Sequence, residues 1–121
     1  MSARRTLAVL GSTGSIGVQT LDVAEREAER LDVVALAAGR SLDTLTAQVA
    51  RWQPRFVAIE HAADPAQARA RLQAACASAD IEVGEGAAAR LAGRCGSDVV
   101  VNGIVGAAGL AASLATLDRG A

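Results

Sequence analysis

A glycine-rich segment near the start of the chain is the strongest chemical signal in the sequence. Gly11, Gly14 and Gly17 recur at intervals of three residues, between an apolar run at 6–10 and an amphipathic helical pattern that begins at Ser15. A turn of this kind exposes the unpaired backbone N–H groups of the first helical turn together with the positive end of the helix dipole. Because anions are stabilised there, the segment predicts a phosphate-binding site.

Each of the three glycines has an expected role in such a site. Gly11 makes the tight turn out of the strand, Gly14 lets the backbone approach a pyrophosphate, and Gly17 lets the helix pack closely on the sheet. The hydroxyl groups expected to add donors to phosphate oxygens belong to Ser12, Thr13 and Ser15. The spacing G-x-x-G-x-x-G is a variant of the dinucleotide-binding fingerprint, which is informative only between a strand and a helix. A turn that merely connects the two elements is the alternative.

The residues after the second expected strand, 31–37, indicate which dinucleotide is bound. An NAD site normally has Asp or Glu there, which binds the adenosine ribose. This chain has Gly39, Arg40 and Ser41 instead, and the nearest acid is Asp43. The guanidinium of Arg40 suits the 2′-phosphate of NADP, and one charge-assisted contact contributes about 1.5–3 kcal/mol. The sequence therefore favours NADP(H) over NAD(H), with a solvated loop arginine as the alternative.

Two further polar positions have weaker signals. A second glycine-rich loop, 102–109, follows an apolar run at 98–101, and small residues there would let the nicotinamide half of a cofactor lie against the backbone. Asn102 is either a polar contact in this loop or part of a turn-forming Asn-Gly pair. His61 follows the third expected strand among acids and alanines, and we expect it to be a solvated loop residue.

The elements that must position these residues alternate between strands and helices. Apolar runs predict strands at 6–10, 31–37, 56–59, 81–83 and 98–101, and helical periodicity predicts helices at 15–30, 41–52, 64–78, 86–94 and 107–119. This order predicts one α/β domain over 1–121, a Rossmann-like, doubly wound and mostly parallel sheet with helices on both faces. Its topological switch point, where ligands bind, is expected between the first strand and 98–101.

Composition excludes several classes of function. The chain has 121 residues and a net charge of −1, with no basic block, so we expect no nucleic-acid partner. It contains no lysine, which excludes a Walker-type phosphate loop and Schiff-base chemistry. The apolar run at 7–10 is too short for a signal peptide, and the uncharged stretch 99–117 is too rich in Gly and Ala for a membrane span. We therefore expect a cytoplasmic location, with Cys76 and Cys95 as reduced thiols.

Four stretches of the sequence together resemble a known family. They are LGSTGSIG at 10–17, VVALAAGR at 33–40, QPRFVAI at 53–59 and IVGAAGL at 104–110. With these motifs the chain resembles the amino-terminal, NADPH-binding part of the 1-deoxy-D-xylulose 5-phosphate reductoisomerase family. The resemblance implies cofactor contacts at Thr13, Gly14, Ser15, Ile16, Gly39, Arg40 and Ser41.

The same resemblance implies an activity for a longer protein. The complete enzyme of this family rearranges its phosphosugar substrate on a divalent metal, Mg or Mn, and reduces the product with NADPH to 2-C-methyl-D-erythritol 4-phosphate in non-mevalonate isoprenoid biosynthesis. By resemblance the catalytic and metal-binding residues lie beyond this chain, which by itself turns over nothing, and the longer enzyme is a homodimer. Two alternatives are another NADP-dependent oxidoreductase, of semialdehyde dehydrogenase type, and a noncatalytic dinucleotide-sensing module.

Overall fold

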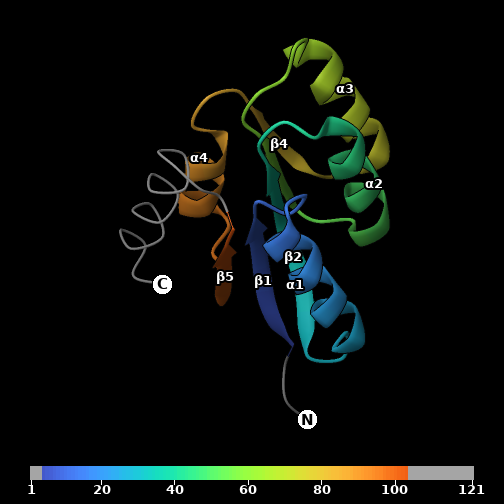
Figure 1. Cartoon of the computed structure of the whole chain (residues 1–121), viewed down its shortest axis with the longest axis vertical. Helices are drawn as coiled ribbons and strands as arrows, with labels where there is room; N and C mark the ends of the chain where they lie inside the picture. Colours follow the sequence, from blue (N-terminus) through green and yellow to red (C-terminus); the bar gives the residue numbers. More distant parts are fainter. Residues whose placement is uncertain (1–3, 104–121) are drawn as a thin grey trace.

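Parallel strands in the order β4-β3-β2-β1-β5 form one sheet in the computed structural model, which describes residues 4–103 (Figure 1). The elements of this part of the chain are β1 (Arg5–Leu10), α1 (Ser15–Arg26), β2 (Leu31–Ala38), α2 (Leu42–Trp52), β3 (Phe56–Ile59), α3 (Pro65–Ala75), β4 (Asp80–Val83), α4 (Ala87–Arg94) and β5 (Val99–Asn102). The predicted parallel α/β class is confirmed, and the expected strands differ from the observed ones by at most one residue at each end. The closing helix expected at 107–119 lies outside the described residues.

The strand β1, which lies between β2 and β5, defines the topological switch point. It pairs in parallel with β2 on one side and with β5, which is far away in the sequence, on the other. This confirms the expected position of the switch point. The carboxyl ends of β1, β2 and β5 therefore meet at one edge of the sheet, where the glycine turn and the loop after β2 also lie (Figure 1).

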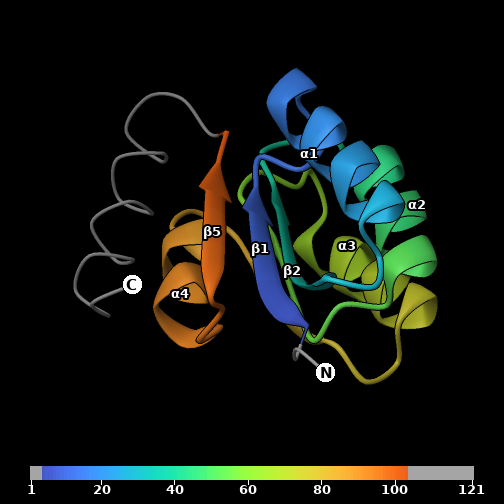
Figure 2. The same ribbon diagram turned by 90° about the horizontal axis from the view of Figure 1, so that it is seen from below.

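The helices cover the two faces of the sheet unequally. Figure 2 shows α1, α2 and α3 on one side and α4 on the other. Because successive strand residues face opposite sides, β1 sends Leu7 and Val9 into the core under α1–α3, and Ala8 and Leu10 into the core under α4. Most strand residues in the second core are alanines, which leaves room for α4 to pack closely.

The first helix is shorter than its sequence pattern predicts. It ends at Arg26 rather than near Arg30, and the N–H of Arg30 donates to the carbonyl of Glu27 in a turn. The chain must reverse there, because Arg5 N–H donates to the carbonyl of Arg30 and so fixes where β2 begins beside β1. The helical periodicity of 15–30 predicts one buried face, formed by Ile16, Gly17, Thr20, Leu21, Ala24 and Ala28. Of these, Gly17, Leu21 and Ala24 are buried in the helix, whereas Ile16 is 55% exposed and Ala28 lies beyond the helix.

The state of the cysteines and the lack of a membrane span were both predicted from composition, and residues 4–103 bear on each. Both cysteines, Cys76 and Cys95, are free thiols. No helix in this part of the chain has the length and hydropathy of a membrane span. Most of the uncharged stretch 99–117 lies outside the described residues.

Candidate functional site

The glycine turn between β1 and α1 is fixed mainly by backbone interactions. Gly11 has a φ of 79°, in the left-handed region that favours glycine. The N–H groups of Gly11 and Ser12 both donate to the carbonyl of Ala37, at 2.7 and 2.9 Å, which ties the turn to the end of β2. The N–H of Gly14 donates to the carbonyl of Gly11 at 3.1 Å and closes the turn. The predicted tight turn at Gly11 is confirmed.

The other two glycines of the turn differ in what surrounds them. A Cβ atom at Gly17 would lie 2.2 Å from the carbonyl oxygen of Gly11 and 2.5 Å from Cα of Ser12, so the fold itself requires glycine there. The predicted close packing is confirmed, although the contact is with the turn rather than with the sheet. A Cβ atom at Gly14 would meet only Gly11 O, at an ordinary 3.5 Å. The missing side chain at Gly14 thus leaves room outside the protein, as the approach of a ligand requires.

Unpaired backbone donors gather at the start of α1. Gly14 is the N-cap, with no capping side chain, and within the described part of the chain the N–H groups of Ser15 and Ile16 have no hydrogen-bond acceptor. Gly14, Ser15 and Ile16 are exposed, Thr13 is half-buried, and the first turn of the helix has no acidic residue. These donors and the helix dipole stabilise an anion at this position.

Ser12 has a different role from the one predicted. Its side chain is fully buried, and its Oγ donates to Oε1 of Gln48 at 2.8 Å, while Nε2 of Gln48 donates to the Ser12 carbonyl at 2.8 Å. The prediction that the Ser12 hydroxyl contacts phosphate is therefore wrong. Gln48 is not among the residues predicted from the sequence, although its spacing from Leu45 along the buried face of α2 is a helical signal that points to it.

The loop after β2 presents its polar groups as side chains. A Cβ atom at Gly39 would meet nothing within 4 Å, so the fold leaves open space there. Arg40 is exposed, and among residues 4–103 no acidic group pairs with its guanidinium. Ser41 is the N-cap of α2, but its hydroxyl makes no capping hydrogen bond. The nearest acid, Asp43, accepts a hydrogen bond from Arg71 at 2.7 Å, so its charge is paired.

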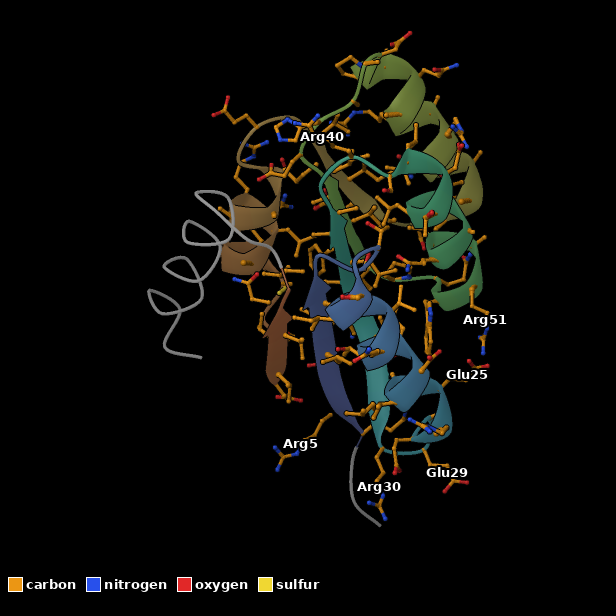
Figure 3. The ribbon with its side chains drawn as sticks, in the orientation of Figure 1. Arg5, Glu25, Glu29, Arg30, Arg40 and Arg51 are labelled. Atoms are coloured by element: carbon orange, nitrogen blue, oxygen red, sulfur yellow. The ribbon has the colours of Figure 1, made fainter. Side chains whose placement is uncertain are left out.

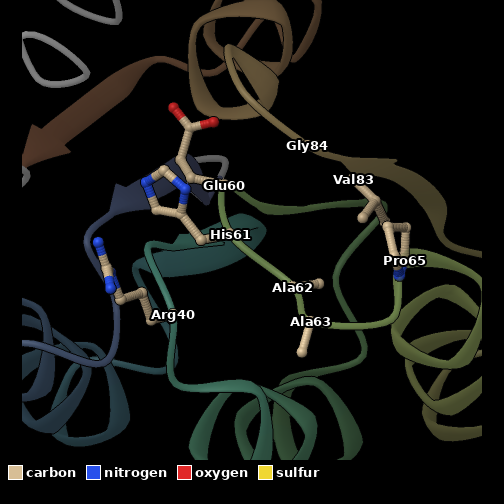
Figure 4. A pocket seen from close by; sticks show the side chains of 8 residues that line it. All are labelled: Arg40, Glu60, His61, Ala62, Ala63, Pro65, Val83 and Gly84. Carbon is tan, nitrogen blue, oxygen red and sulfur yellow. The ribbon is translucent and has the colours of Figure 1, made fainter.

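Arg40 lies between two hollows at the carboxyl edge of the sheet, at the opposite end of the molecule from Arg5 (Figure 3). The first, of about 410 Å³, runs along the start of α2 and includes Ser41. The second, of about 540 Å³, is shown in Figure 4 and is lined by Arg40, Glu60, His61, Ala62, Ala63, Pro65, Val83 and Gly84. Both have the size of the clefts in which proteins bind small molecules.

The end of β5 lies beside the glycine turn. The N–H of Gly103 donates to the carbonyl of Leu10 at 2.7 Å, and a Cβ atom at Gly103 would lie 3.4 Å from Cβ of Ile16. The second glycine-rich loop therefore starts next to the first. Residues 104–109 of that loop lie outside the described residues, so the nicotinamide contact stays a prediction.

The described part of the chain offers no cluster of metal ligands. In the described stretch 4–103, no three His, Cys, Asp or Glu side chains are placed to hold one metal ion. The glycine turn offers backbone N–H donors and the loop after β2 offers the Arg40 guanidinium, both of which suit phosphate groups.

Comparison with known proteins agrees with this geometry. The family model for 1-deoxy-D-xylulose 5-phosphate reductoisomerase matches residues 7–121. The reductoisomerase of Beutenbergia cavernae is 47% identical over 121 residues, which are 99% of this chain and 30% of that protein. The enzyme of a Synechococcus strain is 42% identical over 120 residues, 96% of this chain and 29% of its own length. The chain therefore spans less than a third of these curated relatives.

Solved structures give the same result. The reductoisomerase from Zymomonas mobilis, in complex with NADPH, superposes with a TM-score of 0.86 at 35% identity over 99% of this chain and 31% of its own. A reductoisomerase in complex with NADPH, fosmidomycin and magnesium also has a TM-score of 0.86, at 32% identity over 96% of this chain and 28% of its own. By sequence and by fold, the chain belongs to the 1-deoxy-D-xylulose 5-phosphate reductoisomerase family.

Proposed function

We propose that this chain is the NADPH-binding part of a 1-deoxy-D-xylulose 5-phosphate reductoisomerase. The observation that supports it best is the presence of two places suited to phosphate at one edge of the sheet. One consists of the unpaired N–H groups at Ser15 and Ile16, and the other of the unpaired Arg40 guanidinium beside Ser41. NADP(H) has a pyrophosphate and a separate 2′-phosphate, and so has one group for each place.

The residues of the turn and of the loop after β2 fit this cofactor. The N–H groups of Ser15 and Ile16 bind the pyrophosphate, together with the Thr13 and Ser15 hydroxyls, and Gly14 allows its close approach. Arg40 and Ser41 bind the 2′-phosphate, and Gly39 leaves open space beside them. When bound, NADPH supplies the hydride for the reduction.

The remaining parts of the activity are proposed for a protein with the full length of the family. In that protein a divalent metal, Mg or Mn, and the phosphosugar substrate are bound by residues that this chain does not contain. The product is 2-C-methyl-D-erythritol 4-phosphate, a step of non-mevalonate isoprenoid biosynthesis. We further propose a cytoplasmic homodimer with no nucleic-acid or membrane partner.

The cofactor assignment is tested by titrating the protein with NADPH and NADH and repeating the titration with Arg40→Ala. We expect the substitution to weaken NADPH binding about 10- to 100-fold, since a charge-assisted hydrogen bond contributes about 1.5–3 kcal/mol, and to leave NADH unchanged. Arg5→Ala is the matched control, because Arg5 is also exposed but lies at the opposite end of the molecule (Figure 3). Equal affinities for the two cofactors, unchanged in Arg40→Ala, would refute the assignment.

The reaction itself is tested with the full-length protein. NADPH oxidation is measured with 1-deoxy-D-xylulose 5-phosphate and magnesium or manganese, and the product is identified. An absence of NADPH oxidation with this substrate would exclude the reductoisomerase assignment while leaving cofactor binding intact.

A further inference from the structure

The 540 Å³ hollow beside Arg40 has a second wall whose polar groups the proposed function does not use. This wall is the loop after β3, which contributes Glu60 and His61 to the lining. Because the carboxyl ends of β2 and β3 are neighbours in the sheet, this loop lies directly beside the one that carries Arg40.

Backbone hydrogen bonds hold His61 next to the Arg40 loop. The N–H of Glu60 donates to the carbonyl of Ala38 at 3.0 Å, and the N–H of His61 donates to the carbonyl of Gly39 at 2.8 Å. The pairing of β2 with β3 thus continues past the end of both strands and places His61 beside the residue that precedes Arg40. The His61 side chain is exposed, and it lines the same hollow as the Arg40 side chain (Figure 4).

Glu60, the acidic residue of the same loop, directs its carboxylate to the start of α4. It is only 5% exposed, and its Oε2 accepts a hydrogen bond at 2.8 Å from the N–H of Ala87, the first residue of α4. The positive end of the α4 dipole further stabilises this carboxylate. Of the residues that line the hollow, Arg40, Glu60 and His61 are those with ionisable side chains. Arg40 and His61 are therefore the donors that remain to a ligand there.

We propose that His61 is a second specificity-determining contact for the 2′-phosphate and, with Arg40, sets the preference for NADPH over NADH. This inference rests on the proposed binding of NADPH. A neutral imidazole donates one N–H, and a protonated one donates two and adds a positive charge, so either form binds a phosphate oxygen. A cofactor without the 2′-phosphate gains nothing from either side chain.

The test is a titration of wild-type protein, His61→Ala, His61→Gln and Arg40→Ala with four ligands: NADPH, NADH, adenosine 2′,5′-bisphosphate and AMP. The last two isolate the adenosine half of the cofactor and differ only in the 2′-phosphate. We expect His61→Ala to weaken NADPH and the bisphosphate about 10- to 100-fold, as the loss of one hydrogen bond to a charged group predicts, and to leave NADH and AMP unchanged. His61→Gln, which keeps a donor, is expected to recover part of the loss.

The outcomes separate this inference from the proposed function. If wild-type protein binds neither dinucleotide, the proposed function fails. If wild-type protein prefers NADPH and Arg40→Ala removes the preference, but His61→Ala leaves the ratio of NADPH to NADH affinity unchanged, the inference about His61 is wrong. It is equally wrong if His61→Ala weakens all four ligands by the same factor, because His61 would then contact the adenosine or shape the loop. His61 is exposed, so these variants are expected to fold, which thermal unfolding checks.

Discussion

The two places proposed to bind phosphate are built in different ways. The glycine turn offers backbone N–H groups, and its shape is determined by contacts within the fold: the positive φ of Gly11, the close approach of Gly17 and the buried pair of Ser12 with Gln48. The loop after β2 offers exposed side chains, and a Cβ atom added at Gly39 in this loop would meet no other atom within 4 Å. In the proposed site, the residues that bind the pyrophosphate, which both dinucleotides have, are thus fixed by the fold. The residues that distinguish NADPH from NADH lie on the surface and can change without disturbing the fold.

The largest effect that this comparison predicts is that of Gly17→Ala. The new Cβ would lie 2.2 Å from the carbonyl oxygen of Gly11, so backbone atoms must move. Overpacking of this kind destabilises proteins by about 1–3 kcal/mol, and we expect NADPH and NADH binding to be lost together because the turn itself is displaced. Denaturant unfolding and calorimetric titration measure the two effects.

A matched control for Gly17→Ala is Gly93→Ala in α4. A Cβ atom at Gly93 would meet nothing within 4 Å, so this substitution should be neutral or stabilise the protein by up to about 1 kcal/mol. Equal unfolding free energies for the two variants would show that the fold accommodates a side chain at position 17, contrary to the prediction.

Gly14→Ala separates ligand binding from folding within the same turn. The added Cβ makes an ordinary 3.5 Å contact with Gly11 O, so we expect the unfolding free energy to change by less than about 1 kcal/mol. Both cofactors should nevertheless bind at least about tenfold more weakly, because the methyl group occupies the place of closest approach to the pyrophosphate. Wild-type affinity in this variant would contradict the role assigned to Gly14.

Removing the link between the turn and α2 should weaken cofactor binding less than Gly14→Ala does. Gln48→Leu leaves the buried hydroxyl and carbonyl of Ser12 without this partner, which costs about 1–3 kcal/mol of stability. Both cofactors should weaken by the same factor, with an unchanged ratio between them, as titration with each would measure. Gln19→Leu, at an exposed position of α1, is the control. If Gln48→Leu instead weakened the binding of NADPH but not of NADH, Gln48 would belong to the part of the site that distinguishes the two cofactors.

The smallest expected effect is a change in the acid dependence of stability at Glu82, which belongs neither to the glycine turn nor to the loop after β2. Glu82 accepts hydrogen bonds from Arg90 and Arg94, at 2.9 and 2.6 Å, and the bond from Arg90 is the main reason that its pKa lies below the ordinary 4.5. Because the pKa is lower in the folded state, the stabilisation is complete above pH 4.5 and is lost as the pH falls through the folded-state pKa. Glu82→Gln should remove this acid dependence, less than about 1 kcal/mol in size, and leave cofactor affinity unchanged. Urea unfolding at several pH values checks it, and an unaltered acid dependence would contradict the assignment.

Much of the fold follows from local sequence signals. The alternation of apolar runs with helical stripes predicts the element order. Asp64 followed by Pro65 is a helix-start signal in the sequence, and in the structure Asp64 caps α3. The roles of Gly11 and Gly17 also follow from the sequence, because a turn between a strand and a helix restricts the backbone in a way that glycine spacing records. These features depend on interactions between residues close together in the chain.

Only the tertiary structure decides which polar groups are buried and which remain for a ligand. Ser12 pairs with Gln48 across 36 positions of the sequence, and Glu60 binds the start of α4 across 27. His61 lies beside the Arg40 loop because β2 and β3 are neighbours in the sheet. The amino-acid sequence by itself determined the elements, their order and the glycine turn, since helical and strand periodicity and turn chemistry are local. The donors free to bind a cofactor were settled by the packing of those elements, because a hydrogen bond between distant residues leaves no regular spacing in the chain.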